Sequence, residues 1–171
     1  MLDPAIRCIP RPGFVWVKTV PRSLDQFQLL RSFATGIRKL HLRWKFGIRL
    51  DGSVKISMSS RFVTRSKGSI KVGSETYVTF KTLILTRDGV AGVDRPIRIG
   101  RRCFIGGGSM ICPGVTIGDD CIIAAGSIVD CDVPPRCIAG GNPARVLQEG
   151  IEVGPYGRLA GADERSRALP R

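Results

Sequence analysis

The sequence predicts an all-β fold, a three-sided solenoid of hexapeptide repeats with a helical segment before it. One observation is a column of aliphatic residues that recur every six positions: Ile99, Ile105, Ile111, Ile117, Ile123 and Val129. The other is a second column, four positions later in each hexad, whose chemistry repeats every eighteen residues: Cys103, Ser109, Val115, Cys121, Ser127 and Val133. A period of six fits neither a helix nor an ordinary strand. We therefore expect each hexad to form one side of a coil, with residues eighteen apart stacked at about 4.8 Å.

Residues 1–47 form an N-terminal extension in this prediction. Prolines break residues 1–22, where only residues 14–17 resemble a strand. A helix is expected over about residues 23–46, because Ser23 and Gln26 make a capping box. Apolar residues then follow at spacings of three and four, and basic residues occupy the opposite arc: Leu29, Phe33, Ile37, Leu40 and Trp44 against Arg31, Arg38, Lys39, Arg43 and Lys45.

Two interpretations of this basic amphipathic helix stay open. In the first, the apolar side packs on the solenoid or on another subunit, and the charged face is solvated. In the second, the helix adsorbs to an anionic membrane surface.

The predicted solenoid domain covers residues 48–147. Residues 48–71 predict a degenerate first coil, and clear hexads begin at Val72, with Thr76 and Thr82 in the inward small position. Small residues after the aliphatic column, such as Gly106, are expected to turn sharp corners. A Gly- and Pro-containing loop over residues 88–96 interrupts the period, and such insertions commonly carry function. The C-terminal tail, residues 148–171, is polar and expected to be mobile.

The net charge of +13 is concentrated in the first half of the chain. Residues 1–50 hold ten basic and two acidic residues, whereas residues 88–150 hold six and seven. This imbalance implies an anionic neighbour, such as a phospholipid surface or a nucleotide- or lipid-linked substrate. Nucleic acid is not expected, because no aromatic stacking platform accompanies the charge. Without a secretory h-region or a long apolar run, the chain is expected in the cytoplasm, or peripherally at the inner face of the membrane.

The six cysteines are expected to be reduced and structural. Cys103 and Cys121 occupy the inward column, where a thiol behaves as a small hydrophobe. A bridge between these two remains an alternative. No CxxC pair is present, so no metal site is expected.

The repeat and the residues after it resemble a known family. Residues 105–129 (IGGGSMICPGVTIGDDCIIAAGSIV), then Val133-Pro-Pro and a Gly-Asn-Pro-Ala-Arg signature at residues 141–145, closely resemble the hexapeptide-repeat acyltransferases. Within these the chain is most similar to the maltose and sugar O-acetyltransferase branch, which includes enzymes that decorate polysaccharides and lipopolysaccharide. The resemblance covers residues 70–147 and is absent over residues 1–45.

This resemblance implies a left-handed parallel β-helix and a homotrimer, with acetyl-CoA in a groove between neighbouring subunits. Carried over to this chain, it places four small residues along the pantetheine arm: Gly107, Ser109, Ala125 and Ser127. It places Asn142 and Arg145 near the nucleotide end, where a guanidinium suits phosphates. A purely structural role stays open for each of these residues.

The family pattern breaks at the loop. Acyl transfer to a hydroxyl needs a base, and in many relatives this is a histidine in a Thr-His-Asp-Gly context. Here the stretch is Thr86-Arg87-Asp88-Gly89, so Arg87 occupies the expected base position, where it cannot accept a proton. Asp88 could accept one, although a carboxylate would need burial to raise its pKa. The single histidine, His41, lies on the predicted helix, outside the resembling region.

A second departure concerns the stretch Asp130-Cys-Asp132. It is acidic where the family tends to have a basic residue that meets the cofactor. This departure argues against adenine-nucleotide binding at that point.

The resemblance and its breaks imply two functions. The first is an acetyl-CoA-dependent O-acetyltransferase acting on a sugar or glycan of the cell-envelope type, with a free or lipid-linked acceptor. The second is a catalytically inactive trimeric scaffold of a glycan-synthesis complex, motivated by Arg87 and the basic helix. A γ-class carbonic anhydrase, which shares the solenoid, is excluded because its zinc requires several histidines.

Overall fold

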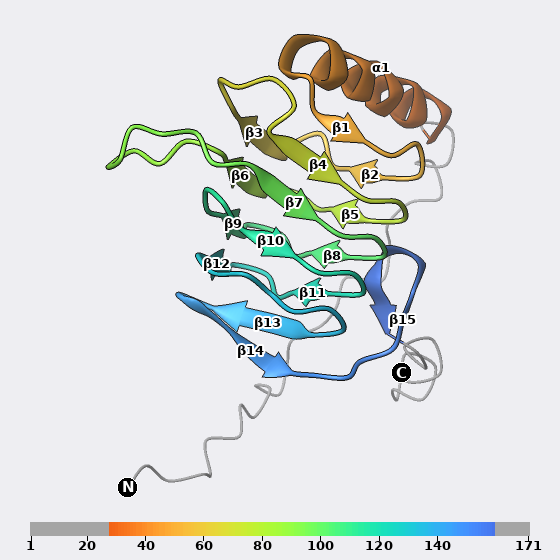
Figure 1. Ribbon diagram of the computed structural model, residues 1–171. Coiled ribbons are helices and arrows are strands. Elements are labelled where there is room, and N and C mark those ends of the chain that lie inside the picture. Colours follow the sequence, from red (N-terminus) through yellow and green to blue (C-terminus); the bar gives the residue numbers. More distant parts are fainter. Residues whose placement is uncertain (1–27, 160–171) are drawn as a thin grey trace, which may run out of the picture. The chain divides into compact units, whose positions relative to one another are not determined.

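The computed structural model describes residues 28–159. The predicted capping box and the strand at residues 14–17 lie outside the described residues. One helix, α1 (Gln28–Phe46), leads into short strands that wind into coils (Figure 1). The strands of the coils are β1 (Arg49–Leu50), β2 (Lys55–Ile56), β3 (Arg61–Val63), β4 (Ile70–Val72), β5 (Tyr77–Val78), β6 (Leu83–Leu85), β7 (Ile97–Ile99), β8 (Phe104–Ile105), β9 (Met110–Ile111), β10 (Thr116–Ile117), β11 (Ile122–Ile123) and β12 (Ile128–Val129).

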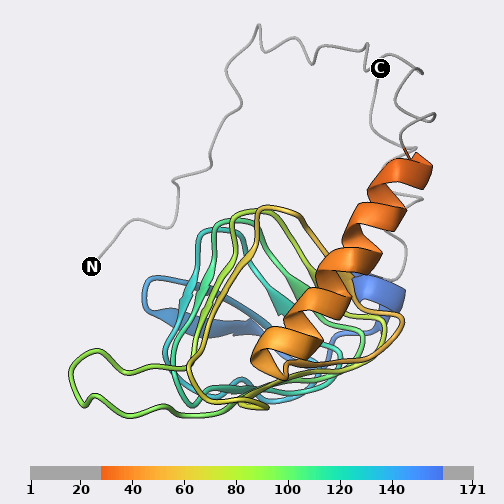
Figure 2. The same cartoon turned by 90° about the horizontal axis from the view of Figure 1, so that it is seen from above.

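Three parallel sheets form the sides of the solenoid, which confirms the predicted architecture. Their strand orders are β1-β4-β7-β10, β2-β5-β8-β11 and β3-β6-β9-β12. Successive coils lie in register: Leu83 pairs with Met110, and Met110 pairs with Ile128 eighteen residues later. Figure 2 shows the coils superimposed along the stack, with the loop over residues 86–96 projecting from one corner. The hairpin β13 (Ile138–Gly141) and β14 (Ala144–Gln148) continues the second sheet.

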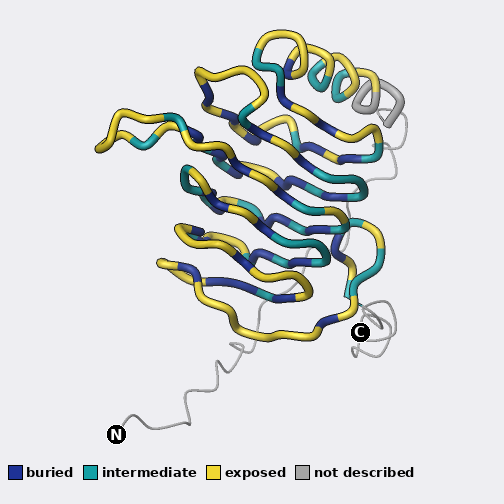
Figure 3. Tube along the Cα trace, in the orientation of Figure 1, coloured by how far each residue is buried: buried dark blue, intermediate teal, exposed yellow. Residues whose placement is uncertain are grey.

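Both predicted columns line the interior (Figure 3). Every member of the aliphatic column and of the second column is buried, and so are Thr76 and Thr82. The Cys103 and Cys121 thiols lie in this core without a disulfide. The neighbouring Cys121 thiol and burial raise the pKa of Cys103, so it stays protonated. The core is therefore a continuous stack of apolar and small polar side chains, as the period of six predicts.

The corner glycines are required for a different reason than the one expected. Gly106 does not adopt a positive φ, whereas Gly108 two residues later does. A Cβ added to Gly106 would lie 2.5 Å from the backbone nitrogen of Ala125 in the next coil. The position therefore excludes a side chain because two coils approach closely there, and the left-handed conformation is adopted elsewhere along each corner.

Helix α1 packs on the first coil with the opposite side from the one expected to pack. Arg38 donates hydrogen bonds to the carbonyls of Met58 and Ser60, and Lys39 donates to the Gly52 carbonyl at 3.2 Å. Leu42, on the same side of the helix, is buried. The first coil has no preceding coil to pair with, so donors from the helix satisfy carbonyls at this end of the stack. Packing of the apolar stripe on the solenoid, one of the alternatives left open, is therefore wrong, whereas packing on another subunit and adsorption to a membrane stay untested.

The C-terminal segment was expected to be a polar tail, yet its first part folds back on the solenoid. Two short strands, β15 (Val153–Gly154) and β16 (Arg158–Leu159), flank a turn, η2 (Pro155–Gly157). The Tyr156 amide donates to the Glu75 carbonyl at 2.8 Å, and its ring lies 3.8 Å from the Lys55 ammonium. Ile151 is buried as well. Contacts with residues far away in sequence order this segment, and the local composition does not reveal them.

A basic ladder runs along the outer face of the first sheet and gives a test of the register. Arg49 pairs with Lys71, which pairs with Arg98, and all three side chains are exposed. Like charges on directly opposite positions destabilise a sheet, so Lys71→Glu converts two repulsive pairs into attractive ones. We expect the melting temperature to rise by about 2–4 °C. The gain should shrink in high salt, and Lys71→Gln should give about half of it. A fall in melting temperature would contradict this register.

Candidate functional site

The loop after β6 is a short hairpin, and it carries Arg87 and Asp88. Arg87 and Asp94 form an antiparallel bridge, and the Asp88 amide donates to the Val93 carbonyl at 2.9 Å. The Val90 side chain at the tip is fully exposed. The hairpin thus projects from the corner between the third and first sheets as an ordered element (Figure 1).

Asp88 holds the tip of this hairpin. Its Oδ1 atom accepts hydrogen bonds from the backbone amides of Ala91 (3.0 Å) and Val90 (2.9 Å). These two bonds favour the ionised form and lower the pKa of the Asp88 carboxyl. Its local environment therefore makes Asp88 a weaker base than an ordinary carboxylate, because the burial that would raise its pKa is missing.

Arg87 and Asp94 stand side by side on the two strands of the hairpin. Arg87 is exposed and makes no ion pair with a residue in the range 28–159. The Oδ2 atom of Asp94 accepts a hydrogen bond from the Ser66 hydroxyl at 2.8 Å, whereas its buried Oδ1 has no partner among the described residues. The hairpin therefore presents a guanidinium to solvent and keeps a carboxylate at its base.

The four small residues predicted along the cofactor divide into two kinds. Gly107 and Ala125 lie on the outside of the corner between the second and third sheets, and the exposed Phe80 ring lies against Gly107. Ser109 and Ser127 are buried, and their hydroxyls donate to the carbonyls of the residues three positions earlier, at 2.6 and 2.7 Å. Their hydroxyls therefore bond within the core, and the predicted position of these two residues along the cofactor concerns their backbone groups and stays a prediction.

Asn142 and Arg145 lie on the β13–β14 hairpin at the C-terminal end of the stack. Arg145 donates to the Ala144 carbonyl at 2.7 Å and lies 3.5 Å from the Asp130 carboxylate. Asp132 accepts a hydrogen bond from the Thr116 amide at 2.7 Å. Both carboxylates of the acidic stretch thus interact within the chain, Asp130 with the Arg145 guanidinium and Asp132 with the Thr116 amide.

The predicted residues therefore occupy different places on the solenoid. Arg87 and Asp88 project from the corner that joins the third sheet to the first, whereas Gly107 and Ala125 lie at the corner that joins the second sheet to the third. Within this chain the structure does not bring the two sets together. His41 is exposed on α1, and its ring meets Phe46 edge-on at 6.5 Å. Among residues 28–159, no group of His, Cys, Asp and Glu side chains is arranged to hold a metal ion.

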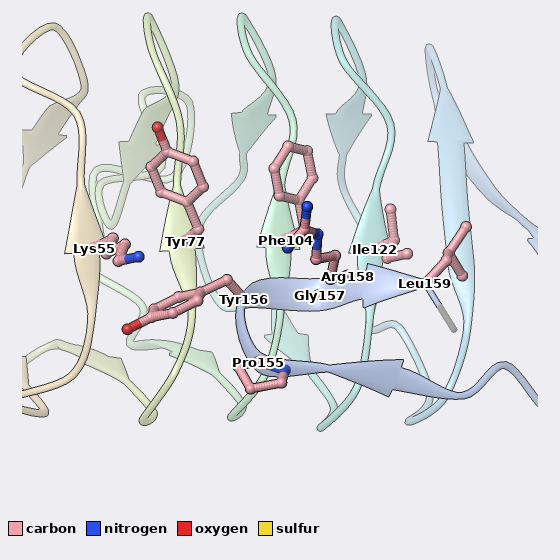
Figure 4. A pocket seen from close by; sticks show the side chains of 9 residues that line it. All are labelled: Lys55, Tyr77, Phe104, Ile122, Pro155, Tyr156, Gly157, Arg158 and Leu159. Carbon is pink, nitrogen blue, oxygen red and sulfur yellow. The ribbon is translucent and has the colours of Figure 1, made fainter. Parts of the chain in front are cut away.

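A hollow of about 810 Å³, which the sequence patterns did not indicate, lies between the second sheet and the C-terminal segment (Figure 4). Outward residues of three neighbouring strands, Tyr77, Phe104 and Ile122, form its floor. Its other wall is the β15–β16 segment, and its charged groups are Lys55 of β2 and Arg158 of β16. The folded-back segment forms one wall of this hollow, so hexad spacing alone could not predict the hollow. None of the predicted site residues line it.

Comparison with known proteins identifies the family. A model of the hexapeptide repeat of succinyl-transferase matches residues 96–131. The galactoside O-acetyltransferase of Escherichia coli (strain K12) is 54% identical over 54 residues, which are 32% of this chain and 27% of that relative. A solved maltose O-acetyltransferase from Clostridium difficile 630 is 30% identical, with a TM-score of 0.54 over 67% of this chain and 75% of that chain. The chain belongs to the hexapeptide-repeat acetyltransferase family.

A third relative extends the fold match. A solved galactoside acetyltransferase in complex with coenzyme A is 22% identical, with a TM-score of 0.51 over 76% of this chain and 84% of that chain. At this identity the match concerns the fold, the left-handed β-helix. The family model lies wholly within β7–β12 and the turns around them. The most regular coils are therefore also the part that the family shares most clearly.

Proposed function

We propose that this hexapeptide-repeat acetyltransferase transfers an acetyl group from acetyl-CoA to a hydroxyl of a sugar or glycan. The observation that carries the proposal is the ordered hairpin of Arg87–Pro96, which projects beside the coils that match the family. Two relatives support the substrate class, since their names describe maltose and galactoside acetyltransferases. The relative that holds coenzyme A supports the donor.

The acyl donor has a suitable surface at the corner of the second and third sheets. On the outer side of this corner, no side chain larger than a methyl group stands at Gly107, Gly108, Ala125 or Gly126. An extended pantetheine arm could lie along this surface, beside the Phe80 ring. Acetyl-CoA would supply the activated acyl group, and the chain would orient the acceptor hydroxyl and accept its proton.

A homotrimer forms part of this proposal. The hairpin and the small-residue corner occupy different corners of one subunit, so a site that uses both needs the corners of two neighbouring subunits. The exposed apolar tip at Val90 and Val93 suits such a contact. Arg87 would then face the acceptor as a fixed positive charge, and Asp88 or a group of the neighbouring subunit would accept the proton.

The alternative function, an inactive trimeric scaffold of a glycan-synthesis complex, is favoured by one observation. Arg87 stands where the family resemblance leads one to expect a histidine, and the lowered pKa of Asp88 makes that carboxylate a weak substitute.

Two measurements separate the two functions. One is the binding of acetyl-CoA, followed by calorimetry, and the other is the release of the CoA thiol in the presence of maltose, galactosides and acidic glycans. For a transferase, we expect both binding and acceptor-dependent release. Asp88→Asn keeps an oxygen that accepts the amide bonds of the hairpin tip, so it isolates the proton-acceptor role. If Asp88 is the base, this variant should lose about 10²-fold in kcat while binding acetyl-CoA normally. Binding without release on any acceptor would favour the scaffold, and absence of binding would remove the acetyl-CoA assignment.

A further inference from the structure

Helix α1 turns an apolar stripe away from the solenoid. Phe33, Ile37, Leu40 and Trp44 recur at helical spacing and are 71%, 55%, 69% and 82% exposed. Figure 3 shows the exposed side of the helix facing away from the first coil. A contiguous row of large exposed apolar side chains is uncommon on a monomer surface and indicates an interaction site.

The orientation of the stripe is set by specific contacts. Arg38 and Lys39 donate to carbonyls of the first coil, and Leu42 is only 7% exposed. Leu42 lies on the side of the helix opposite to Ile37, Leu40 and Trp44, since successive residues are about 100° apart. The polar anchors hold one side of the helix against the coil, so no apolar surface of the solenoid within residues 48–159 covers the stripe.

The charge around the stripe is entirely positive. Between Gln26 and Asp51 the chain has no acidic residue and six basic ones: Arg31, Arg38, Lys39, Arg43, Lys45 and Arg49. Arg43 and Lys45 are exposed, and they lie on the two flanks of the stripe by helical spacing. The occupant of this face must therefore combine an apolar interior with negative charge.

Charge decides between the candidate occupants. A second copy of the same face would bring the same cations together. The chain's own residues 1–27 hold four basic and two acidic residues, so they do not supply the missing negative charge either. An anionic phospholipid surface offers acyl chains and phosphate groups together.

We infer that the exposed face of α1 binds the surface of an anionic lipid bilayer, with the stripe among the acyl chains and the flanking cations at the phosphates. The helix would lie in the plane of the interface. Among the described residues no helix has the length and hydrophobicity to cross a bilayer. The inference does not depend on the proposed catalytic function, because none of these residues belongs to the proposed site.

Trp44 provides the test. The chain has two tryptophans, so Trp16→Phe in the full-length protein leaves Trp44 as the sole reporter. We expect its emission to shift to shorter wavelength with vesicles of phosphatidylglycerol and phosphatidylcholine, and not with phosphatidylcholine alone. Raising the ionic strength to about 1 M should weaken the shift. Lipids brominated in the acyl chain should quench the emission.

Matched variants in a vesicle sedimentation assay sharpen the result. Leu40→Asp should lower the partition coefficient at least about tenfold, whereas Leu147→Asp, at an exposed apolar residue of β14, should leave it unchanged. Arg43→Gln and Lys45→Gln should each lower it about fivefold, and Lys81→Gln, on another coil, should not.

Two outcomes would overturn the inference. One is an emission spectrum that is already at short wavelength in the free protein and does not respond to vesicles, which would mean that another part of the chain or a second copy covers the stripe. The other is a change of oligomeric state in Leu40→Asp without any vesicle binding by the parent protein, which would assign the stripe to a subunit contact.

Discussion

Replacing Arg87 with histidine should raise the rate of acetyl transfer by about 10²–10⁴-fold, the contribution of a positioned general base. Arg87 stands on the hairpin next to Asp88, at the position where the family resemblance predicts a base. Arginine stays protonated at ordinary pH, whereas a neutral imidazole can accept the proton of the acceptor hydroxyl. Steady-state kcat with acetyl-CoA and the best acceptor is the measurement.

The pH dependence identifies the cause of any gain. The imidazole must be neutral to act as a base, so kcat of Arg87→His should rise as the pH increases through about 6.5 and then level off. Arg95→His adds a histidine to the other strand of the same hairpin and should give no gain, since it changes the position and not the chemistry. An equal or lower rate in Arg87→His would instead show that the guanidinium itself is used, for instance to hold an anionic acceptor.

Gly106→Ala should strongly destabilise the fold, although it adds only one methyl group. The added Cβ would lie 2.5 Å from the Ala125 nitrogen and 2.6 Å from the Ile123 oxygen, which are backbone atoms of the next coil. Relief requires two coils to separate, and overpacking of this kind costs up to about 3 kcal/mol. We expect the melting temperature to fall by about 6–12 °C, measured by thermal unfolding followed by circular dichroism.

Gly89→Ala is the matched control for this prediction. An added Cβ there has no atom within 4 Å, and the residue does not adopt a positive φ. Its melting temperature should therefore stay within about 1 °C of the wild type, as is usual for surface substitutions. Similar values for the two variants would mean that the coils can separate at little cost, contrary to the close approach at Gly106.

The arrangement of the site has a consequence for how activity depends on assembly. Arg87 and Gly107 lie at different corners of neighbouring coils, so neither the hairpin nor the small-residue corner forms a complete site alone. In the proposed trimer each site would combine one subunit's hairpin with another subunit's corner. Activity would then be lost on dissociation even if each subunit stayed folded.

The interior of the solenoid could be predicted residue by residue, and the candidate site only in part. Ile105 and Cys103 are buried as predicted, because a period of six repeats the same local geometry in every coil. The same regularity left the role of the Ser109 side chain open. A small polar residue at a corner is compatible with a cofactor groove and with a hydroxyl bonded in the core, and the structure shows that this hydroxyl donates to the Gly106 carbonyl. Asp88 was likewise recognised by position, whereas its role in holding the hairpin tip depends on two backbone amides.

The sequence by itself determined the coils and the interruption at Arg87–Pro96, because both follow from spacing along the chain, and the motif at residues 141–145 indicated the family by resemblance. Only the tertiary structure decided which side of α1 faces the solenoid and where residues 151–159 lie. Spacing predicts an amphipathic helix without specifying its partner. Here the carbonyls of Met58 and Ser60 lie at the end of the stack, where no preceding coil supplies hydrogen-bond donors. Hydrogen bonds from the helix to these carbonyls therefore stabilise this end more than further apolar packing would. Arg38 supplies those donors, and the apolar stripe is left facing outward as a consequence.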